Sequence, residues 1–151
     1  MPLAKSHLLR RGRVSEPGRL YLLTTATHKR IPFFQDFYHA RLVIHQLRQC
    51  DHVGACHSLA WVVMPDHVHW LIELKTGTLG NLMRRFKARS SYALRRAGVE
   101  SDQIWQSGYQ DRALRQEEDV RRVARYIVAN PLRAGLVTSI RNYPHWDAVW
   151  L

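Results

Sequence analysis

The chain has 151 residues, enough for one domain with a hydrophobic core but too few for two large ones. Hydrophobic residues make up 46% of it, which argues against a disordered chain, and no apolar run approaches the roughly 18 residues of a transmembrane helix. The formal net charge of +11 favours a polyanionic partner, and nucleic acid is the commonest one.

Cysteine content and the N-terminal sequence bear on the environment of the protein. Two cysteines do not make a disulfide framework, so we expect Cys50 and Cys56 to be reduced in a cytoplasmic protein. The N-terminal segment lacks the apolar stretch of a signal peptide. We expect a basic arm over residues 1–18 and a single domain over residues 19–151.

Hydrophobic periodicity predicts strands and helices in a recognisable order. In chain order these are a strand (19–27), a helix (36–49), a hairpin of two strands (57–64 and 67–74), a helix (78–97), a short strand (109–115) and a helix (116–129). Met64-Pro65-Asp66 forms the hairpin turn, and Pro131 ends the last helix. The order βαββαβ, followed by one more helix, predicts an α+β fold of the ferredoxin-like, split βαβ type with an antiparallel sheet.

Two histidines one residue apart lie at the start of the second hairpin strand. Side chains at i and i+2 of a strand point to the same face, so His67 and His69 can reach one metal ion or phosphate. The alternative is a pair of half-buried histidines with ordinary hydrogen bonds.

A second pair of polar residues lies in the last predicted helix. Tyr126 and Asn130 are four residues apart, so they share a helix face at the edge of the apolar stripe. An Asn oxygen is a suitable ligand for Mg²⁺ or Mn²⁺, and a tyrosine that is activated can act as a nucleophile. The two pairs together would make a phosphoryl-transfer site, although the alternative for Tyr126, judged from spacing alone, is a core-edge tyrosine.

These motifs resemble those of a known family. His67-Val68-His69 has the His-hydrophobic-His form of the HUH signature, and RYIVANPLRAGLV, from Arg125 to Val137, resembles the tyrosine-helix segment of the REP-associated tyrosine transposases. These belong to the single-tyrosine HUH (IS200-like) transposase superfamily. WVVMPDHVHWLIEL, IWQSGYQDRALR and PGRLYLLTTATHKRIPFF are also similar, so the resemblance runs from about Pro17 to Trp146.

The resemblance implies a role for each of these residues. His67 and His69 would bind the metal, Mg²⁺ or Mn²⁺, and Tyr126 would be the nucleophile. Asn130 would be the third ligand, at a position where insertion-sequence relatives usually carry Gln. The implied reaction cleaves single-stranded DNA near a hairpin, leaving a 5′-phosphotyrosine and a free 3′-hydroxyl, and rejoining reverses it. The resemblance also implies a bacterial cytoplasmic protein associated with the nucleoid.

Basic residues provide candidate contacts to hairpin or single-stranded DNA. They occur in two groups, one in the second predicted helix and one near the tyrosine helix. The first group is Arg84, Arg85, Lys87, Arg89, Arg95 and Arg96, and the second is Arg112, Arg115, Arg121, Arg122 and Arg133. The family resemblance suggests that the arm, with Lys5, Arg10, Arg11 and Arg13, holds bases of a recognition tetranucleotide.

Two other classes of function compete with a DNA-cleaving transposase. A domesticated transposase that binds hairpin DNA without cutting it would not need His67, His69 and Tyr126 together. A histidine phosphoesterase of another fold would usually carry a second histidine motif, which the sequence lacks. Monomer and homodimer both remain compatible with the sequence.

Overall fold

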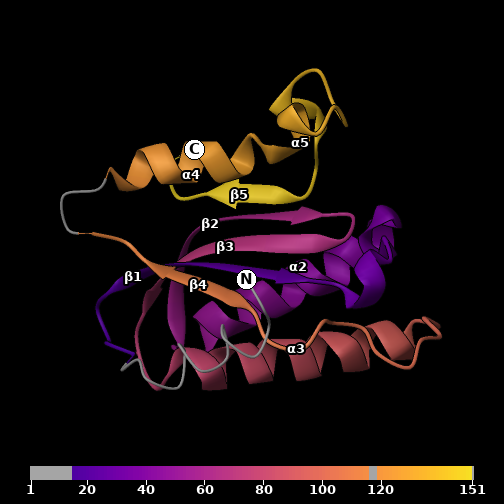
Figure 1. Cartoon of the computed structure of the whole chain (residues 1–151), viewed down its shortest axis with the longest axis horizontal. Helices are drawn as coiled ribbons and strands as arrows, with labels where there is room; N and C mark the ends of the chain where they lie inside the picture. The colour runs from indigo at the N-terminus through magenta and orange to yellow at the C-terminus, as the bar shows by residue number, and fades with distance from the viewer. Residues whose placement is uncertain (1–14, 116–118, 151) are drawn as a thin grey trace.

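The structure is a computed structural model and describes residues 15–115 and 119–150. Five strands form one antiparallel sheet in the order β4-β1-β3-β2-β5. The strands are β1 (Leu20–Ala26), β2 (Cys56–Met64), β3 (His67–Leu74), β4 (Gln110–Ala113) and β5 (Trp146–Ala148). The helices are α2 (Phe37–His52), α3 (Leu79–Arg96), α4 (Val120–Val128) and α5 (Asn130–Arg133), and the short 3₁₀ turns are η1 (His28–Arg30), η2 (Phe33–Gln35) and η3 (Ile140–Asn142) (Figure 1).

The predicted α+β, ferredoxin-like order is confirmed. β1, α2, β2, β3, α3 and β4 follow one another as expected, and β3 lies between β1 and β2. The Pro65-Asp66 turn joins β2 and β3 into a hairpin, in which Met64 pairs with His67. Side chains of Asp36 and Thr78 accept hydrogen bonds from backbone N–H groups in the first turns of α2 and α3, which fixes where both helices begin.

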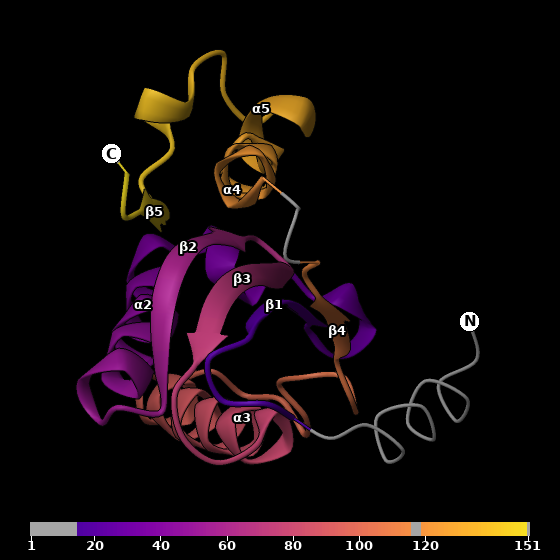
Figure 2. The ribbon, with the colours of Figure 1, turned by 90° about the vertical axis from the view of Figure 1, so that its left-hand side faces the viewer.

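The sheet has two different faces, because side chains alternate along each strand. Val68, Trp70 and Ile72 of β3 point into a large core beneath α2 and α3. Leu71, on the opposite face, joins a smaller cluster with Ala124 and Ile127 of α4. Figure 2 shows the consequence: α2 and α3 cover one side of the sheet, and α4 lies on the other.

The C-terminal third differs from the sequence-based prediction in two ways. The last predicted helix ends at Ala129, and α4 ends one residue earlier at Val128; Asn130, expected in the same helix as Tyr126, begins the separate four-residue α5. Pro131 lies in the first turn of α5, where its missing N–H costs no hydrogen bond, so it begins a helix here rather than ending one. β5 was not predicted, and it extends the sheet beside β2.

The remaining general predictions concern the termini, the cysteines and membranes. The expected arm lies outside the described residues as far as residue 14, and the expected helix start at 116–118 also lies outside them. Cys50 and Cys56 are buried and free. No helix in the part of the chain that the structure describes is long and apolar enough to cross a membrane.

Candidate catalytic site

The histidine pair lies at the start of β3, on the same face of the sheet against which α4 packs. The rings of His67 and His69 are neighbours, with centroids 4.9 Å apart and planes at 82°. Val68 between them points into the core on the other face and is 1% exposed. The prediction that both imidazoles share one face of a strand is therefore confirmed.

His67 is oriented by an acidic residue that precedes it in sequence. Its Nδ1 lies 2.8 Å from Oδ1 of Asp66, and Oδ2 of Asp66 accepts a hydrogen bond of 2.9 Å from Nε of Arg30. Burial raises the pKa of Asp66, but the hydrogen bonds from Arg30 and His67 outweigh it, and the pKa lies below its usual value. Because an ionised Asp66 accepts a hydrogen bond from Nδ1–H of His67, the lone pair of the His67 ring is placed on Nε2.

The backbone that carries Arg30 adopts an unusual conformation. Lys29 and Arg30 have φ values of 53° and 56°, in the left-handed region that residues with a Cβ rarely adopt. Such backbone is retained where surrounding contacts hold it. Here the turn directs the Arg30 side chain to Asp66 across 36 residues of sequence.

His69 is held by the neighbouring strand. Thr24 of β1 lies opposite His69 in the sheet register, and its Oγ1 is 2.9 Å from Nδ1 of the ring. Burial lowers the pKa of His69 to about 4, and Coulombic interactions with His67, Arg133 and Arg30 lower it further. The ring is therefore neutral at physiological pH, with Nε2 as the nitrogen left for a ligand.

The packing of α4 places the second predicted pair. Asp119 caps this helix by accepting hydrogen bonds from the N–H groups of Arg121 and Arg122. The buried side of α4 faces the sheet, whereas Tyr126 points away from the core and is 64% exposed. The guanidinium of Arg133 lies over the Tyr126 ring, 3.8 Å from its centroid, close enough for a cation–π contact.

Asn130 lies against the histidine pair. Its Nδ2 is 3.4 Å from Nε2 of His67, although the two residues are 63 positions apart in sequence. Since Asn130 begins α5, one residue beyond the end of α4, the prediction that Tyr126 and Asn130 lie in one continuous helix is wrong. The break at Ala129 nevertheless brings the amide to His67. Arg133 connects the two halves of the site, because it contacts Tyr126 and its charge acts on His69.

The donor set suits a divalent metal. Nε2 of His67 faces Asn130, and rotating the Asn130 amide by half a turn would present its oxygen to that nitrogen. The contact of His69 Nδ1 with Thr24 leaves Nε2 of His69 for a ligand. Imidazole suits transition-metal ions and an amide oxygen suits Mg²⁺ or Mn²⁺, and the carboxylate behind His67 is the usual outer partner of a metal-binding histidine. Among the described residues no group of three or more His, Cys, Asp or Glu side chains could hold a metal ion. A third protein ligand beside the two histidines would come from another residue type, such as the amide of Asn130.

A cleft of about 950 Å³ extends from the histidine pair along β1 and β4. His67, His69 and Arg30 line one part of it, and Gln103, Gln106 and Gln110 contribute amide groups. Of the predicted DNA contacts, Arg112 also lines this cleft. Sequence reasoning missed Arg30, Asp66 and Thr24, and only Asp66 had a visible signal, its position next to His67.

The other predicted DNA contacts are distributed over both sides of the sheet. Arg115, Arg121 and Arg122 are exposed at β4 and α4, with Arg121 stacked on Trp150. The α3 residues lie on the helix that covers the opposite side of the sheet from the histidine pair. Arg84, Arg89, Arg95 and Arg96 are exposed there, and Arg85 is half-buried. Lys87 donates to the carbonyls of Gln106 and Gly108, so it holds the loop before β4.

The comparisons with known proteins identify the class of protein to which this fold and site belong as a family of transposases. The family model described as "Transposase IS200 like" matches residues 20–130, and the chain belongs to this family. An Escherichia coli K12 protein named REP-associated tyrosine transposase is 31% identical over 87 residues, 56% of this chain. The chain spans about half the length of this relative, 50%.

Two further comparisons cover more of the chain. A Haemophilus influenzae protein named for the same transposases is 22% identical over 139 residues, 85% of this chain and 78% of its own. A solved structure of a REP-associated tyrosine transposase bound to a REP hairpin superposes with a TM-score of 0.74 at 24% identity. It covers 89% of this chain and 79% of that one, and it shows that the two proteins share a fold.

Proposed function

We propose that the protein cleaves and rejoins single-stranded DNA beside a hairpin, through a 5′-phosphotyrosine on Tyr126. The observation that supports this most directly is the contact between His67 and Asn130, which brings the histidine pair to the segment that follows Tyr126. The substrate class is proposed from the relative whose structure contains a REP hairpin. Acting on chromosomal DNA, the protein would work in the bacterial cytoplasm.

The reaction exchanges one phosphoester for another. The Tyr126 oxygen attacks the phosphorus, the bond from phosphorus to the 3′-oxygen breaks, and the phenolic proton is transferred through solvent to the leaving oxygen. The products are a tyrosine ester of the 5′-phosphate and a free 3′-hydroxyl. A 3′-hydroxyl attacking the tyrosine ester reverses the sequence, so no external energy source is required.

The residues of the site have separable roles in this proposal. His67, His69 and Asn130 would hold a divalent metal, which when bound would polarise the scissile phosphate. Arg133 places a positive charge beside the Tyr126 ring, where it can bind the phosphate that the ring approaches. Exposure of Tyr126 allows a polymeric substrate to reach it.

A covalent-adduct experiment tests the proposal. A hairpin oligonucleotide with a single-stranded extension, labelled on either side of the cleavage point, is incubated with protein and Mn²⁺ or Mg²⁺ and separated under denaturing conditions. We expect only the fragment with the 5′-phosphate to migrate with the protein. Tyr126→Phe should abolish the adduct, and His67→Ala should reduce it strongly. His57→Ala is the control, because His57 is exposed on β2 outside the site.

Two results would contradict cleavage through Tyr126. An adduct that persists in Tyr126→Phe would exclude this nucleophile. Wild-type protein that shifts hairpin DNA but never cleaves it would indicate a DNA-hairpin binding protein instead.

A further inference from the structure

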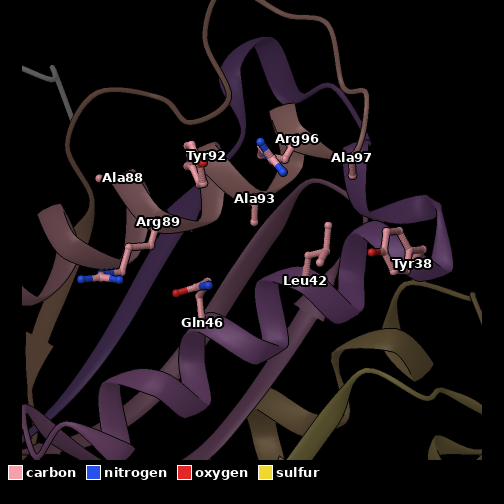
Figure 3. A pocket seen from close by; sticks show the side chains of 9 residues that line it. All are labelled: Tyr38, Leu42, Gln46, Ala88, Arg89, Tyr92, Ala93, Arg96 and Ala97. Carbon is pink, nitrogen blue, oxygen red and sulfur yellow. The ribbon is translucent and has the colours of Figure 1, made fainter.

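A groove lies between α2 and α3 (Figure 3). These two helices cover the side of the sheet away from the histidine pair. Its volume is about 700 Å³, and none of the residues that line it is acidic. Tyr38 and Gln46 of α2 form one wall, and Arg89, Tyr92 and Arg96 of α3 form the other. Small residues of α3 between these side chains keep the groove open.

On the α3 wall, an arginine, a tyrosine and a second arginine form a stripe along the helix. Arg89, Tyr92 and Arg96 are at positions i, i+3 and i+7, so they lie along one side of the helix. At 1.5 Å per residue, the two arginines are about 10.5 Å apart along the axis, with the tyrosine between them. That distance corresponds to about three nucleotide steps of 3.4 Å in a stacked strand.

The chemistry of the stripe is not explained by folding. Tyr38 and Tyr92 are 61% and 66% exposed, so their rings contribute little to the core. Arg89 and Arg96 are also exposed, and neither forms an ion pair within residues 15–115 and 119–150. α3 contains no Asp or Glu along its whole length, so the surrounding surface repels cations and attracts polyanions.

We propose that this groove binds unpaired nucleotides of DNA, with Arg89 and Arg96 on phosphates and a base stacked on Tyr92. Exposed aromatic rings beside cationic side chains are the features with which proteins hold single strands without reading their sequence. The proposal depends on the function proposed above in one respect, that DNA is the polyanion. Because the groove and the histidine pair lie on opposite faces, nucleotides in the groove are held away from Tyr126 and are not cleaved.

The test measures single-strand binding with the cleavage site inactive. In a Tyr126→Phe background, anisotropy of a labelled single-stranded oligonucleotide is measured over a range of salt concentrations. We expect Tyr92→Ala to weaken binding by about 5- to 150-fold, the range for loss of one stacking side chain, and Tyr92→Phe to retain it. Arg89→Gln with Arg96→Gln should lower the slope of log affinity against log salt by about 1.4, since each phosphate contact on a single strand contributes about 0.7.

A charge control and a mapping experiment locate the effect. Arg48→Gln removes one charge from the exposed surface of α2, where Arg48 lies over Trp61 outside the groove, and should leave the affinity nearly unchanged. Photocrosslinking with 5-iododeoxyuridine should label Tyr92 or Tyr38. Circular dichroism establishes that each variant is folded.

Three results would overturn the proposal. The first is a Tyr92→Ala protein that binds the oligonucleotide as tightly as its parent, and the second is crosslinking confined to the histidine side of the sheet. The third is a change of sedimentation coefficient in Tyr92→Ala without a change in DNA affinity, which would make the groove a contact between copies of the chain. Each can occur whether or not wild-type protein forms the Tyr126 adduct, so failure here is distinguishable from failure of the cleavage proposal.

Discussion

The hydrogen bonds that link Arg30 to Asp66 and Asp66 to His67 predict that metal affinity depends on a carboxylate that is not itself a ligand. Oδ1 of Asp66 accepts a hydrogen bond of 2.8 Å from Nδ1–H of His67, and this bond directs Nε2 to the site. Removing the outer partner of a metal-binding histidine typically costs 10- to 100-fold in affinity, about 1.4–2.7 kcal/mol. We therefore expect Asp66→Ala to weaken Mn²⁺ binding by about this factor.

Two further substitutions rank the contributions of Asp66 and Arg30 to metal affinity. Asp66→Asn keeps an oxygen that can accept a hydrogen bond from Nδ1–H but loses the charge. It should therefore weaken Mn²⁺ binding less than Asp66→Ala does. Arg30 is 55% exposed and its partner Asp66 27%, so their ion pair is well solvated. An exposed pair is worth up to about 1 kcal/mol, and Arg30→Gln should cost at most about fivefold.

Calorimetric titration of the DNA-free protein with Mn²⁺ measures these affinities directly. Glu73→Gln is the matched control, because it removes a carboxylate from the same face of the same strand. Glu73 is four residues beyond His69, about 13 Å along the strand, too far to orient either ring. If His67→Ala loses Mn²⁺ binding while Asp66→Ala keeps wild-type affinity, the carboxylate does not orient the ligand and the reasoning fails.

Four other predictions concern thiol chemistry, the pH dependence of stability, and packing. Burial raises the pKa of the Cys50 thiol to about 11 and raises that of Cys56 further. At pH 8, both thiols should therefore react with a disulfide reagent at least about 100-fold faster in urea than in the folded protein. The same shifts mean that the free energy of unfolding falls as the pH rises from 9 toward 11, because the unfolded thiols ionise first. Ser90→Ala should destabilise the fold by about 1–3 kcal/mol in urea unfolding, since the buried Trp105 Nε1, now 3.0 Å from the Ser90 hydroxyl, would lose its acceptor. Leu71→Ala should cost about 2–5 kcal/mol by the same measurement, and no loss would mean that α4 does not depend on this contact.

Strand periodicity made the histidine pair predictable. Side chains alternate strictly along β3, so Val68, Trp70 and Ile72 had to share the apolar face and His67 and His69 the other. The hairpin turn at Pro65-Asp66 has an equally local signal.

Features that depend on tertiary contacts were not predictable. Trp146 to Ala148 form a strand only because the exposed edge of β2 offers unpaired backbone groups, and three residues carry no readable alternation. Arg30 reaches Asp66 from a left-handed turn that its own sequence does not indicate. A helical pattern also does not say which face of a sheet the helix covers, so the sequence did not indicate that the α3 arginines and the tyrosine helix lie on opposite sides of the sheet.

The position of α4 follows from the composition of the β3 face that it covers. Leu71 is the apolar residue between His69 and Glu73 on that face, and with Ala60 of β2 it forms the surface against which Ala124 and Ile127 pack. A helix seated at Leu71 covers the middle of the strand and leaves the His67 end open to the cleft. Asn130 follows the end of α4 after one residue, Ala129, and its Nδ2 lies 3.4 Å from Nε2 of His67. We therefore expect the Ala129 interruption to be needed for the site, because a continuous helix would keep Asn130 in line with Tyr126.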